Sequence, residues 1–221
     1  MQRYEKKWIY QAPRRFFLYF CSVNMENIIQ QTVDTLLAGG TVLYPTDTIW
    51  GVGCDARRAD AVEKLYALKE RDRSKSMLVL WNSVGTQRAA SAIDEMLTDA
   101  ARCVPTEERP TTYILPESIW RPLLGDGIAA NLPAEDGTLG IRVPRHAFCQ
   151  EVVRRLGAPL VSTSANLSGH PSPIIYNDIE EELKRRVDYC VPPLEEFLSG
   201  ERRGSRIVKV EADGTETLIR P

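Results

Sequence analysis

Residues 41–53 read TVLYPTDTIWGVG and combine an apolar run, a proline, two threonines and two closely spaced glycines. The apolar half favours a buried β-strand, and the proline after it favours a turn. The threonines are therefore expected at the exit of a strand, where α/β sheets commonly bind ligands. An ordinary turn, in which Thr46 or Asp47 bonds local backbone, explains the same residues.

Apolar periodicity predicts alternating helices and strands on both sides of this stretch. Residues 26–40 form a helix pattern that ends in the left-handed stop Gly39-Gly40 and has one apolar face, made by Ile28, Ile29, Val33, Leu36 and Leu37. Further helices are expected within residues 60–71, 84–103, 147–157 and 177–187. Strands are expected at residues 76–81, 111–116, 137–144 and 159–166, and a hairpin at residues 206–220 that turns at Asp213-Gly214.

The alternation without a long linker or repeat predicts one α/β domain, and the terminal hairpin indicates a mixed rather than a purely parallel sheet. The first residues resemble a truncated signal sequence, with basic flanks around FFLYFC. That run is shorter than an h-region of roughly 7–15 residues, and no A-x-A site follows it. Because a helix pattern begins at Met25, we expect residues 1–24 to be an N-terminal extension and residues 25–221 to be the functional domain.

Composition excludes several classes of function. The chain has 28 Lys and Arg against 30 Asp and Glu, so its net charge of −2 gives no overall attraction to nucleic acid or membrane. Five dispersed cysteines and two histidines offer neither a disulfide framework, a zinc site nor a Ser-His-Asp triad. A transmembrane run of about 20 apolar residues is absent from the sequence. We therefore expect a cytoplasmic protein without membrane partners or a protein-built metal site.

Polar residues gather in three segments at predicted element ends, PTDT, KERDRSK and STSANLSG. The cations of KERDRSK suit phosphate or carboxylate, but cations at a helix C-terminus also simply complement the helix dipole. The donors of STSANLSG suit phosphate oxygens or an amino-acid backbone, but they also suit a plain turn. No GxxxxGK[ST] or GxGxxG motif occurs, so a nucleotide would be held in another way.

Five segments in a fixed order resemble the YrdC family of threonylcarbamoyl-AMP synthases, from about Glu26 to the C-terminus. They are YPTDTIWGVG, LYALKERDRSKSM, RPTTYIL, GTLGIRVP and STSANLSGHPSP. Their order is more specific than any one of them, since STSANLSG and PTDTIWGVG are far apart in the chain. The resemblance implies a twisted mixed β-sheet flanked by helices, with an open concave face.

The resemblance also implies the site residues. The family signature K-x-R plus S-x-N falls here on four residues expected to be catalytic and to bind ATP: Lys69, Arg71, Ser164 and Asn166. Substrate-binding residues are expected at Thr46, Thr48, Lys75 and Arg142. Further ATP-binding residues are expected at Thr112 and Ser205 and at Arg202, for which Arg203 is the alternative.

The implied activity is that of a nucleotidyltransferase, which condenses L-threonine, bicarbonate or CO2, and ATP into threonylcarbamoyl-AMP and pyrophosphate for tRNA threonylcarbamoyladenosine modification. Mg²⁺ would arrive on the ATP phosphates. The chain resembles the single-domain form, so separate proteins would transfer the threonylcarbamoyl group. One alternative is a YrdC-like protein that binds tRNA or double-stranded RNA without synthase activity. Another is the carbamoyl-adenylate chemistry of hydrogenase maturation, whose zinc-finger and acylphosphatase-like regions the sequence lacks.

The chain departs from the family pattern at several positions. Where the family commonly has K-G-R-P-x-x-K-P-L, Glu70, Asp72 and Ser76 replace Gly, Pro and Pro. Trp50 replaces a usual Tyr, and residues 204–206 read Gly-Ser-Arg in place of Pro-Ser-Thr. These substitutions are expected to change the shape of the loops that hold the substrates.

Overall fold

The computed structural model describes residues 14–72, 77–81, 110–194 and 203–221, with side chains described from residue 24 onward. The helices are α1 (Arg14–Leu37), α2 (Ala59–Lys69), α4 (Glu117–Leu124), α5 (Ala147–Leu156) and α6 (Glu181–Arg186), with a 3-10 turn, η1, at Tyr176–Asp178. The strands are β1 (Val42–Tyr44), β2 (Gly51–Gly53), β3 (Leu78–Leu80), β4 (Thr111–Leu115), β5 (Leu139–Arg142), β6 (Leu160–Ser164), β7 (Tyr189–Cys190), β8 (Arg206–Val210) and β9 (Glu216–Arg220). The helix expected at residues 84–103 lies outside the described residues.

The described strands form one nine-stranded sheet in the order β7-β1-β2-β6-β3-β5-β4-β8-β9. Three pairs are parallel, namely β1 with β7, β3 with β5, and β4 with β8, and the remaining pairs are antiparallel. The predicted α/β fold with a mixed sheet is therefore confirmed. The expected terminal hairpin is also present, with Gly214 at φ 84° in its turn.

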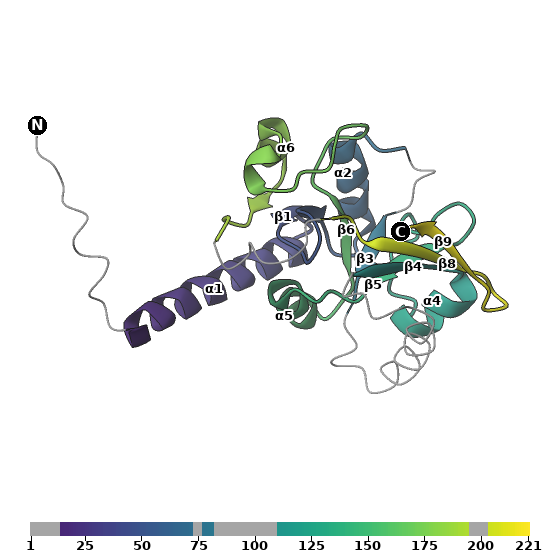
Figure 1. The fold of residues 1–221 in the computed structure, drawn as a ribbon, viewed down its shortest axis with the longest axis horizontal. Coiled ribbons are helices and arrows are strands. Elements are labelled where there is room, and N and C mark those ends of the chain that lie inside the picture. Colours follow the sequence, from purple (N-terminus) through teal and green to yellow (C-terminus); the bar gives the residue numbers. More distant parts are fainter. Residues whose placement is uncertain (1–13, 73–76, 82–109, 195–202) are drawn as a thin grey trace, which may run out of the picture.

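Each face of the sheet carries its own hydrophobic core, because successive side chains of a strand point to opposite faces. Leu43, Val79 and Val161 pack with α2 and with Trp120 of α4. Their neighbours in the strands, including Leu80 and Leu160, pack with α1 and α5 on the other face. In Figure 1, α2 lies above the central strands and α5 lies below them.

Helix α1 begins at Arg14, well before the pattern that starts at Met25. Its first half extends away from the sheet in Figure 1. Four of the five predicted inward side chains are buried, but Leu37 is 48% exposed, because the helix ends there and the chain turns through Gly39 at φ 82°. The assignment of residues 1–24 to an extension stays a prediction.

The segment expected as one helix at residues 177–187 is divided in the structure. The short turn η1 comes first, and α6 begins only at Glu181, because Ile179 and Glu180 have extended rather than helical backbone. The Asp178 carboxylate accepts hydrogen bonds from the Ile174 and Ile175 amides at 3.3 and 3.2 Å. An aspartate that bonds nearby backbone in this way competes with helix formation.

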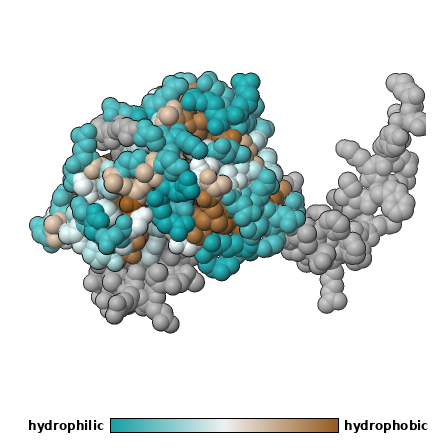
Figure 2. All heavy atoms as spheres, turned by 180° about the vertical axis from the view of Figure 1, so that it is seen from behind, coloured by the Kyte–Doolittle hydropathy of each residue, from teal (hydrophilic) through white to brown (hydrophobic). Residues whose placement is uncertain are grey.

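The described surface is mainly hydrophilic. Seen from behind, in Figure 2, hydrophobic residues gather only in small patches among hydrophilic ones. The most exposed large apolar side chains come from four separate segments and are Leu37, Val143, Ile174, Ile175, Leu218 and Ile219. Within the described ranges, no helix has the length and apolarity that crossing a membrane requires.

Two backbone constraints shape the strands and turns around the site. A Cβ at Gly53 would lie 1.9 Å from the Val161 carbonyl oxygen, so β2 can approach β6 only with glycine at this position. Glu70, at the C-terminal cap of α2, has φ 49° and ψ 39°. It is the position at which the resembled family commonly has glycine, and this left-handed conformation is the one that glycine adopts most easily.

Replacing Glu70 should relieve this strain only when the new residue lacks a Cβ. A left-handed L-residue costs roughly 1–2 kcal/mol. Glu70→Gly is therefore expected to unfold in urea with a free energy about 1 kcal/mol higher than that of Glu70→Ala. The alanine variant is the matched control, since both variants lose the 3.4 Å ion pair between Glu70 and Arg186. A glycine variant no more stable than the alanine variant would contradict a left-handed residue 70.

Candidate functional site

A pocket of about 230 Å³ lies on the face of the sheet that carries Leu80 and Leu160. Its floor is a row of residues paired across four strands, namely Ser162, Leu78, Gly140 and Ile114. On this face β6 changes from apolar Leu160 to Ser162 and Ser164, so the packed core gives way to a polar cavity. A Cβ at Gly140 would lie 3.1 Å from the Leu78 Cβ, so glycine keeps the floor open.

The loop between β1 and β2 forms one wall of the pocket, and it contains both threonines of PTDT. The Thr46 hydroxyl donates to the Ile49 carbonyl at 2.7 Å and accepts the Thr48 amide at 3.0 Å. The two threonine hydroxyls lie 2.9 Å apart, and both residues line the pocket. The sequence left a turn and a ligand wall as alternatives, and Thr46 serves both, since it shapes the turn and faces the cavity.

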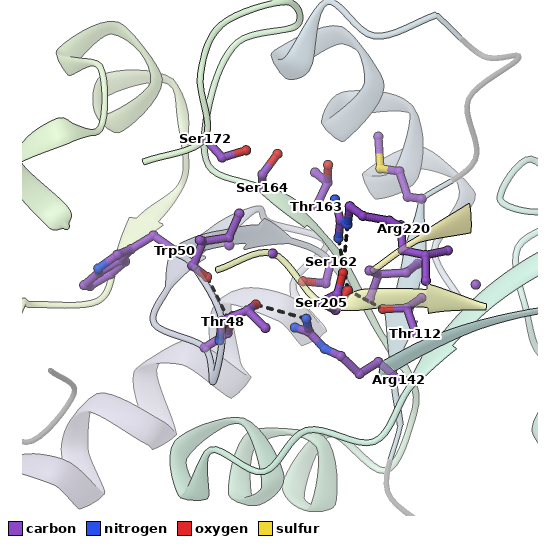
Figure 3. Close-up of a pocket in the computed structure, with 18 of the residues that line it drawn as sticks. Thr48, Trp50, Thr112, Arg142, Ser162, Thr163, Ser164, Ser172, Ser205 and Arg220 are labelled. Carbon is purple, nitrogen blue, oxygen red and sulfur yellow. Dashed lines mark hydrogen bonds between the residues drawn. The ribbon is translucent and has the colours of Figure 1, made fainter. Parts of the chain in front are cut away.

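Arg142, at the end of β5, connects this loop to the floor. Its side chain is only 4% exposed, and its Nη1 donates to the Thr48 hydroxyl at 3.0 Å. Its Nη2 lies 3.6 Å from Oδ1 of Asp47, whose side chain is 8% exposed. The guanidinium is therefore part of the pocket lining and is held from behind by the same loop (Figure 3).

The other end of the pocket is built by β4, β8 and β9. The Thr112 and Ser205 hydroxyls lie 2.8 Å apart, and both residues are buried. Arg220 donates from Nη2 to the Ser205 hydroxyl at 3.2 Å and from Nε to the Ser205 carbonyl at 2.8 Å. Figure 3 shows these three residues grouped apart from Thr48. A guanidinium beside two hydroxyls is suited to bind an anion.

The segment after β6 returns over the pocket. Ser164 and Ser172 line the cavity on the side opposite Thr48 and Arg142 in Figure 3. The Trp50 ring is turned away from these hydroxyls and meets Tyr176 edge to face, with centroids 5.1 Å apart. Lys184 lies over the Tyr176 ring at 4.4 Å. The tryptophan that replaces a usual tyrosine therefore anchors this returning segment.

Lys69, the last residue of α2, lies behind the pocket lining and is 1% exposed. Its Nζ donates to the backbone carbonyls of Ser164 and Asn166 and to Asn166 Oδ1. Burial, reinforced by the charge of Arg71, lowers the pKa of Lys69 to about 7, while Glu180 opposes the shift. Lys69 therefore binds the backbone that presents Ser164.

Asn166 completes this support. Its Nδ2 donates to the carbonyls of Leu167 and His170 at 2.9 and 2.7 Å, and the residue is 8% exposed. The Ser168 amide in turn donates to the Lys69 carbonyl at 3.1 Å. The loop after β6 is thus closed on itself and tied to the end of α2.

The charges of the pocket have one sign. Arg71, Arg142 and Arg220 line it, and none of the described lining residues is Asp or Glu. Burial lowers the pKa of Arg71, but an arginine side chain remains protonated in proteins. Hydroxyl groups supply most of the remaining polar lining, from Thr46, Thr48, Thr112, Ser162, Thr163, Ser164, Ser172 and Ser205. Such a lining favours a ligand rich in negative charge.

Seven of the residues selected from the sequence line this one pocket, namely Thr46, Thr48, Arg71, Thr112, Arg142, Ser164 and Ser205. Lys69 and Asn166 lie directly behind Ser164 rather than in the lining. Lys75 and Arg202 lie outside the described residues. Sequence reasoning missed Arg220 and Ser172, although the predicted hairpin was a signal for Arg220, because it pairs the end of β9 with β8 beside Ser205.

Comparison with protein families gives a match over most of the chain. The Sua5/YciO/YrdC family model, described as telomere recombination, matches residues 34–221. The threonylcarbamoyl-AMP synthase of Xanthomonas campestris pv. campestris (strain B100) is 34% identical over 166 residues, which cover 72% of this chain and 82% of that protein. The threonylcarbamoyl-AMP synthase of Vibrio parahaemolyticus serotype O3:K6 (strain RIMD 2210633) is 32% identical, with the same coverage of each chain.

Solved structures show the same fold. P. abyssi Sua5, crystallised in complex with L-threonine, superposes with a TM-score of 0.67 at 23% identity, covering 87% of this chain. This chain spans only 53% of the length of that Sua5. E. coli YciO superposes with a TM-score of 0.61 at 21% identity, covering 89% of each chain. At these identities the structural likeness establishes the fold alone.

The buried Lys69 should give stability a characteristic pH dependence. Its pKa is lower in the folded state than the ordinary value of 10.5, so between about pH 7 and pH 10.5 the unfolded chain binds more protons. The free energy of unfolding of the wild type, minus that of Lys69→Met, should therefore rise with pH across this interval. Urea titrations at several pH values measure this difference.

Lys64→Met is the matched control for this measurement, because Lys64 is an exposed lysine of the same helix. The free energy of unfolding of Lys64→Met is measured at the same pH values and compared with that of Lys69→Met. This comparison removes the effect of losing an exposed lysine from the same helix. A difference for Lys69→Met that stays constant or falls between pH 7 and pH 10.5 would show that burial does not disfavour the charged ammonium at this position.

Proposed function

Since the chain belongs to the Sua5/YciO/YrdC family, we propose that it is a threonylcarbamoyl-AMP synthase. It condenses L-threonine, bicarbonate or CO2, and ATP into threonylcarbamoyl-AMP and pyrophosphate. Its named relatives of 32–37% identity carry this activity in their names. The reaction class is nucleotidyl transfer, because the AMP moiety passes from pyrophosphate to the carbamate of threonine.

The observation that carries the proposal is the lining of the pocket. Three arginines and eight hydroxyl residues converge on it, and no carboxylate is present among the described lining residues. ATP, bicarbonate, the threonine carboxylate and the carbamate are all anionic, so every reactant gains from this lining. A carboxylate in the lining would repel each of them.

Each end of the pocket suits a different reactant. Thr112, Ser205 and Arg220 form the end for the nucleotide phosphates, where hydroxyls and a guanidinium lie together. Thr46, Thr48 and Arg142 form the end for threonine, since hydroxyl groups and a buried guanidinium complement a hydroxyl and a carboxylate. We assign Arg71 and Ser164, which also line the pocket, to the α-phosphate.

The chemistry depends mainly on positioning. A carbamate oxygen of threonine attacks the α-phosphorus of ATP, the new P–O bond forms, and the bond to the leaving pyrophosphate oxygen breaks. The carbamate is a weak nucleophile that loses CO2 readily, so it must be held close to the phosphate and away from water. Fixed guanidinium groups stabilise the charge that develops on the α-phosphate and on pyrophosphate.

Mg²⁺ fits this site only as a companion of ATP. The described lining residues offer hydroxyls and cations but no carboxylate, and Mg²⁺ in proteins is typically bound through one or two carboxylates or through substrate phosphates. When bound, the ion supplies charge neutralisation to the phosphates. Arg71 and Arg220 would bind phosphate oxygens of the same nucleotide.

The product is the precursor for tRNA threonylcarbamoyladenosine modification. Threonylcarbamoyl-AMP is a reactive mixed anhydride, and we propose that separate proteins transfer its threonylcarbamoyl group to the adenosine beside certain tRNA anticodons. RNA binding without synthesis is the alternative function for this fold, and the same assay separates the two.

The assay supplies purified protein with labelled bicarbonate, L-threonine and Mg-ATP. Labelled threonylcarbamoyl adenylate should form together with an equal amount of pyrophosphate, and both should require threonine. Equal release of pyrophosphate without threonine would overturn the proposal. Salt-dependent tRNA binding without any adenylate would establish the RNA-binding alternative instead.

Arg71→Ala should lower kcat by about 10²–10³, the usual loss when one fixed donor to a developing anion is removed. Its thermal midpoint should change little, because Arg71 is at the end of α2 and lines the cavity. Arg154→Ala is the matched control, since Arg154 is an exposed arginine of α5 that pairs with Glu151 outside the pocket. Equal turnover in the two variants would refute the role given to Arg71.

A further inference from the structure

Asp47 is an acidic residue, with a largely buried side chain, of the loop that forms one wall of the pocket, and the proposed reaction gives it no role. It lies between Thr46 and Thr48, but it does not line the cavity. Its Oδ2 accepts the Arg145 amide at 2.9 Å, and its Oδ1 faces Arg142 Nη2 at 3.6 Å. It therefore contacts the residues that follow β5 while its two neighbours face the substrate side.

The contact between Asp47 and Arg142 is long for an ion pair whose only role is to stabilise the fold. The 3.6 Å separation is too long for a hydrogen bond. Within the described part of the chain, Asp47 Oδ1 and Arg142 Nε are buried atoms without a hydrogen-bond partner. A buried ion pair is often no more stabilising than apolar residues of similar volume. Stability alone is thus a weak reason for a carboxylate at this position.

The orientation of Arg142 supplies a better reason. A guanidinium carries its donors in one rigid plane, so two partners are enough to fix it. The Thr48 hydroxyl accepts a hydrogen bond from Nη1 at 3.0 Å, and the negative charge of Asp47 attracts Nη2 at 3.6 Å. The Thr48 hydroxyl in turn lies 2.9 Å from the hydroxyl of Thr46. One carboxylate thus acts on two neighbouring side chains of the pocket lining, Arg142 directly and Thr48 through it.

We propose that Asp47 is a positioning residue for the threonine end of the pocket. Its carboxylate sets the plane of the Arg142 guanidinium and, through it, the direction of the Thr48 hydroxyl at the end of the pocket that receives L-threonine. The inference rests on the proposed function, because it takes L-threonine as the ligand of this end. Asp47 acts on the substrate through Arg142 and does not touch it.

Asp47→Asn is the decisive variant, because an asparagine keeps an oxygen that accepts the Arg145 amide but removes the negative charge. The dissociation constant for L-threonine should rise about tenfold. This is the loss expected when a misoriented Arg142 no longer makes one charge-assisted hydrogen bond to threonine. The constant for ATP should stay within about twofold of the wild type, since the phosphate end does not involve Asp47. Calorimetric titration measures both constants without turnover, and threonine is titrated with and without a non-hydrolysable ATP analogue.

Asp188→Asn is the matched control. Asp188 also accepts backbone and hydroxyl hydrogen bonds, from the Thr41 amide at 2.7 Å and the Thr41 hydroxyl at 3.0 Å, but at the far end of β1 from the PTDT loop. The same chemical change there should leave both dissociation constants unchanged. Thermal unfolding of each variant shows whether a change in binding reflects loss of the fold.

A double-mutant cycle with Arg142→Lys tests the route of action. If Asp47 works through Arg142, then Asp47→Asn should weaken threonine binding much less in the Arg142→Lys background than in the wild type. Additive effects of the two substitutions would overturn the inference. So would unchanged threonine binding by Asp47→Asn, or an equal loss of threonine and ATP binding accompanied by a lower thermal midpoint.

These results are distinguishable from failure of the proposed function. A wild type that binds threonine but forms no adenylate refutes the synthase activity, and the comparison of Asp47→Asn with Asp188→Asn still decides the positioning role. A wild type that binds no threonine in either titration overturns the inference itself.

Discussion

The hydrogen bonds of the Lys69 ammonium to the carbonyls of Ser164 and Asn166 hold the site together. Where β6 ends, its backbone carbonyls leave the sheet and need donors, because unpaired buried carbonyls are costly. A buried lysine supplies up to three donors from one point. The Ser168 amide returns a hydrogen bond to the Lys69 carbonyl, so α2 and the loop after β6 fix each other. Ser164 can face the pocket only because this junction is closed.

The chain has a net charge close to zero and a strongly cationic pocket, because its carboxylates lie outside the pocket lining that the structure describes. Asp47 lies behind the wall, while Arg71 and Arg220 reach the cavity from segments far apart in the sequence. Exposed carboxylates pair with arginines on the outer helices, as Glu151 does with Arg154. The net charge of −2 is a sum over the whole chain and thus gives no information about the charge of the site.

The fold was predictable because its signals are local. Strands such as β6 and the hairpin of β8 and β9 are short apolar runs bounded by turn residues, and Gly157 and Gly214 adopt the positive φ that their stop positions suggest. The two-faced core follows from the period of two within each strand. The left-handed Glu70 was not predictable from residue preferences, since glutamate disfavours this conformation. Likewise, Asp178 divides a helix that apolar periodicity alone predicts as continuous.

The site was predictable where side chains touch the cavity in a recognisable motif, as Thr46 and Ser164 do. It was not predictable where a side chain acts on another one, because that depends on which atoms the fold brings together. Lys69 was selected as a catalytic group, yet its described contacts are with the backbone beneath Ser164. Asp47 was considered only as a turn residue that bonds local backbone, whereas its partners Arg142 and Arg145 lie far away in the sequence. Motifs therefore identify the residues that line the pocket. The residues that orient this lining can be identified only from the structure, which brings the loop after β1 next to the end of β5.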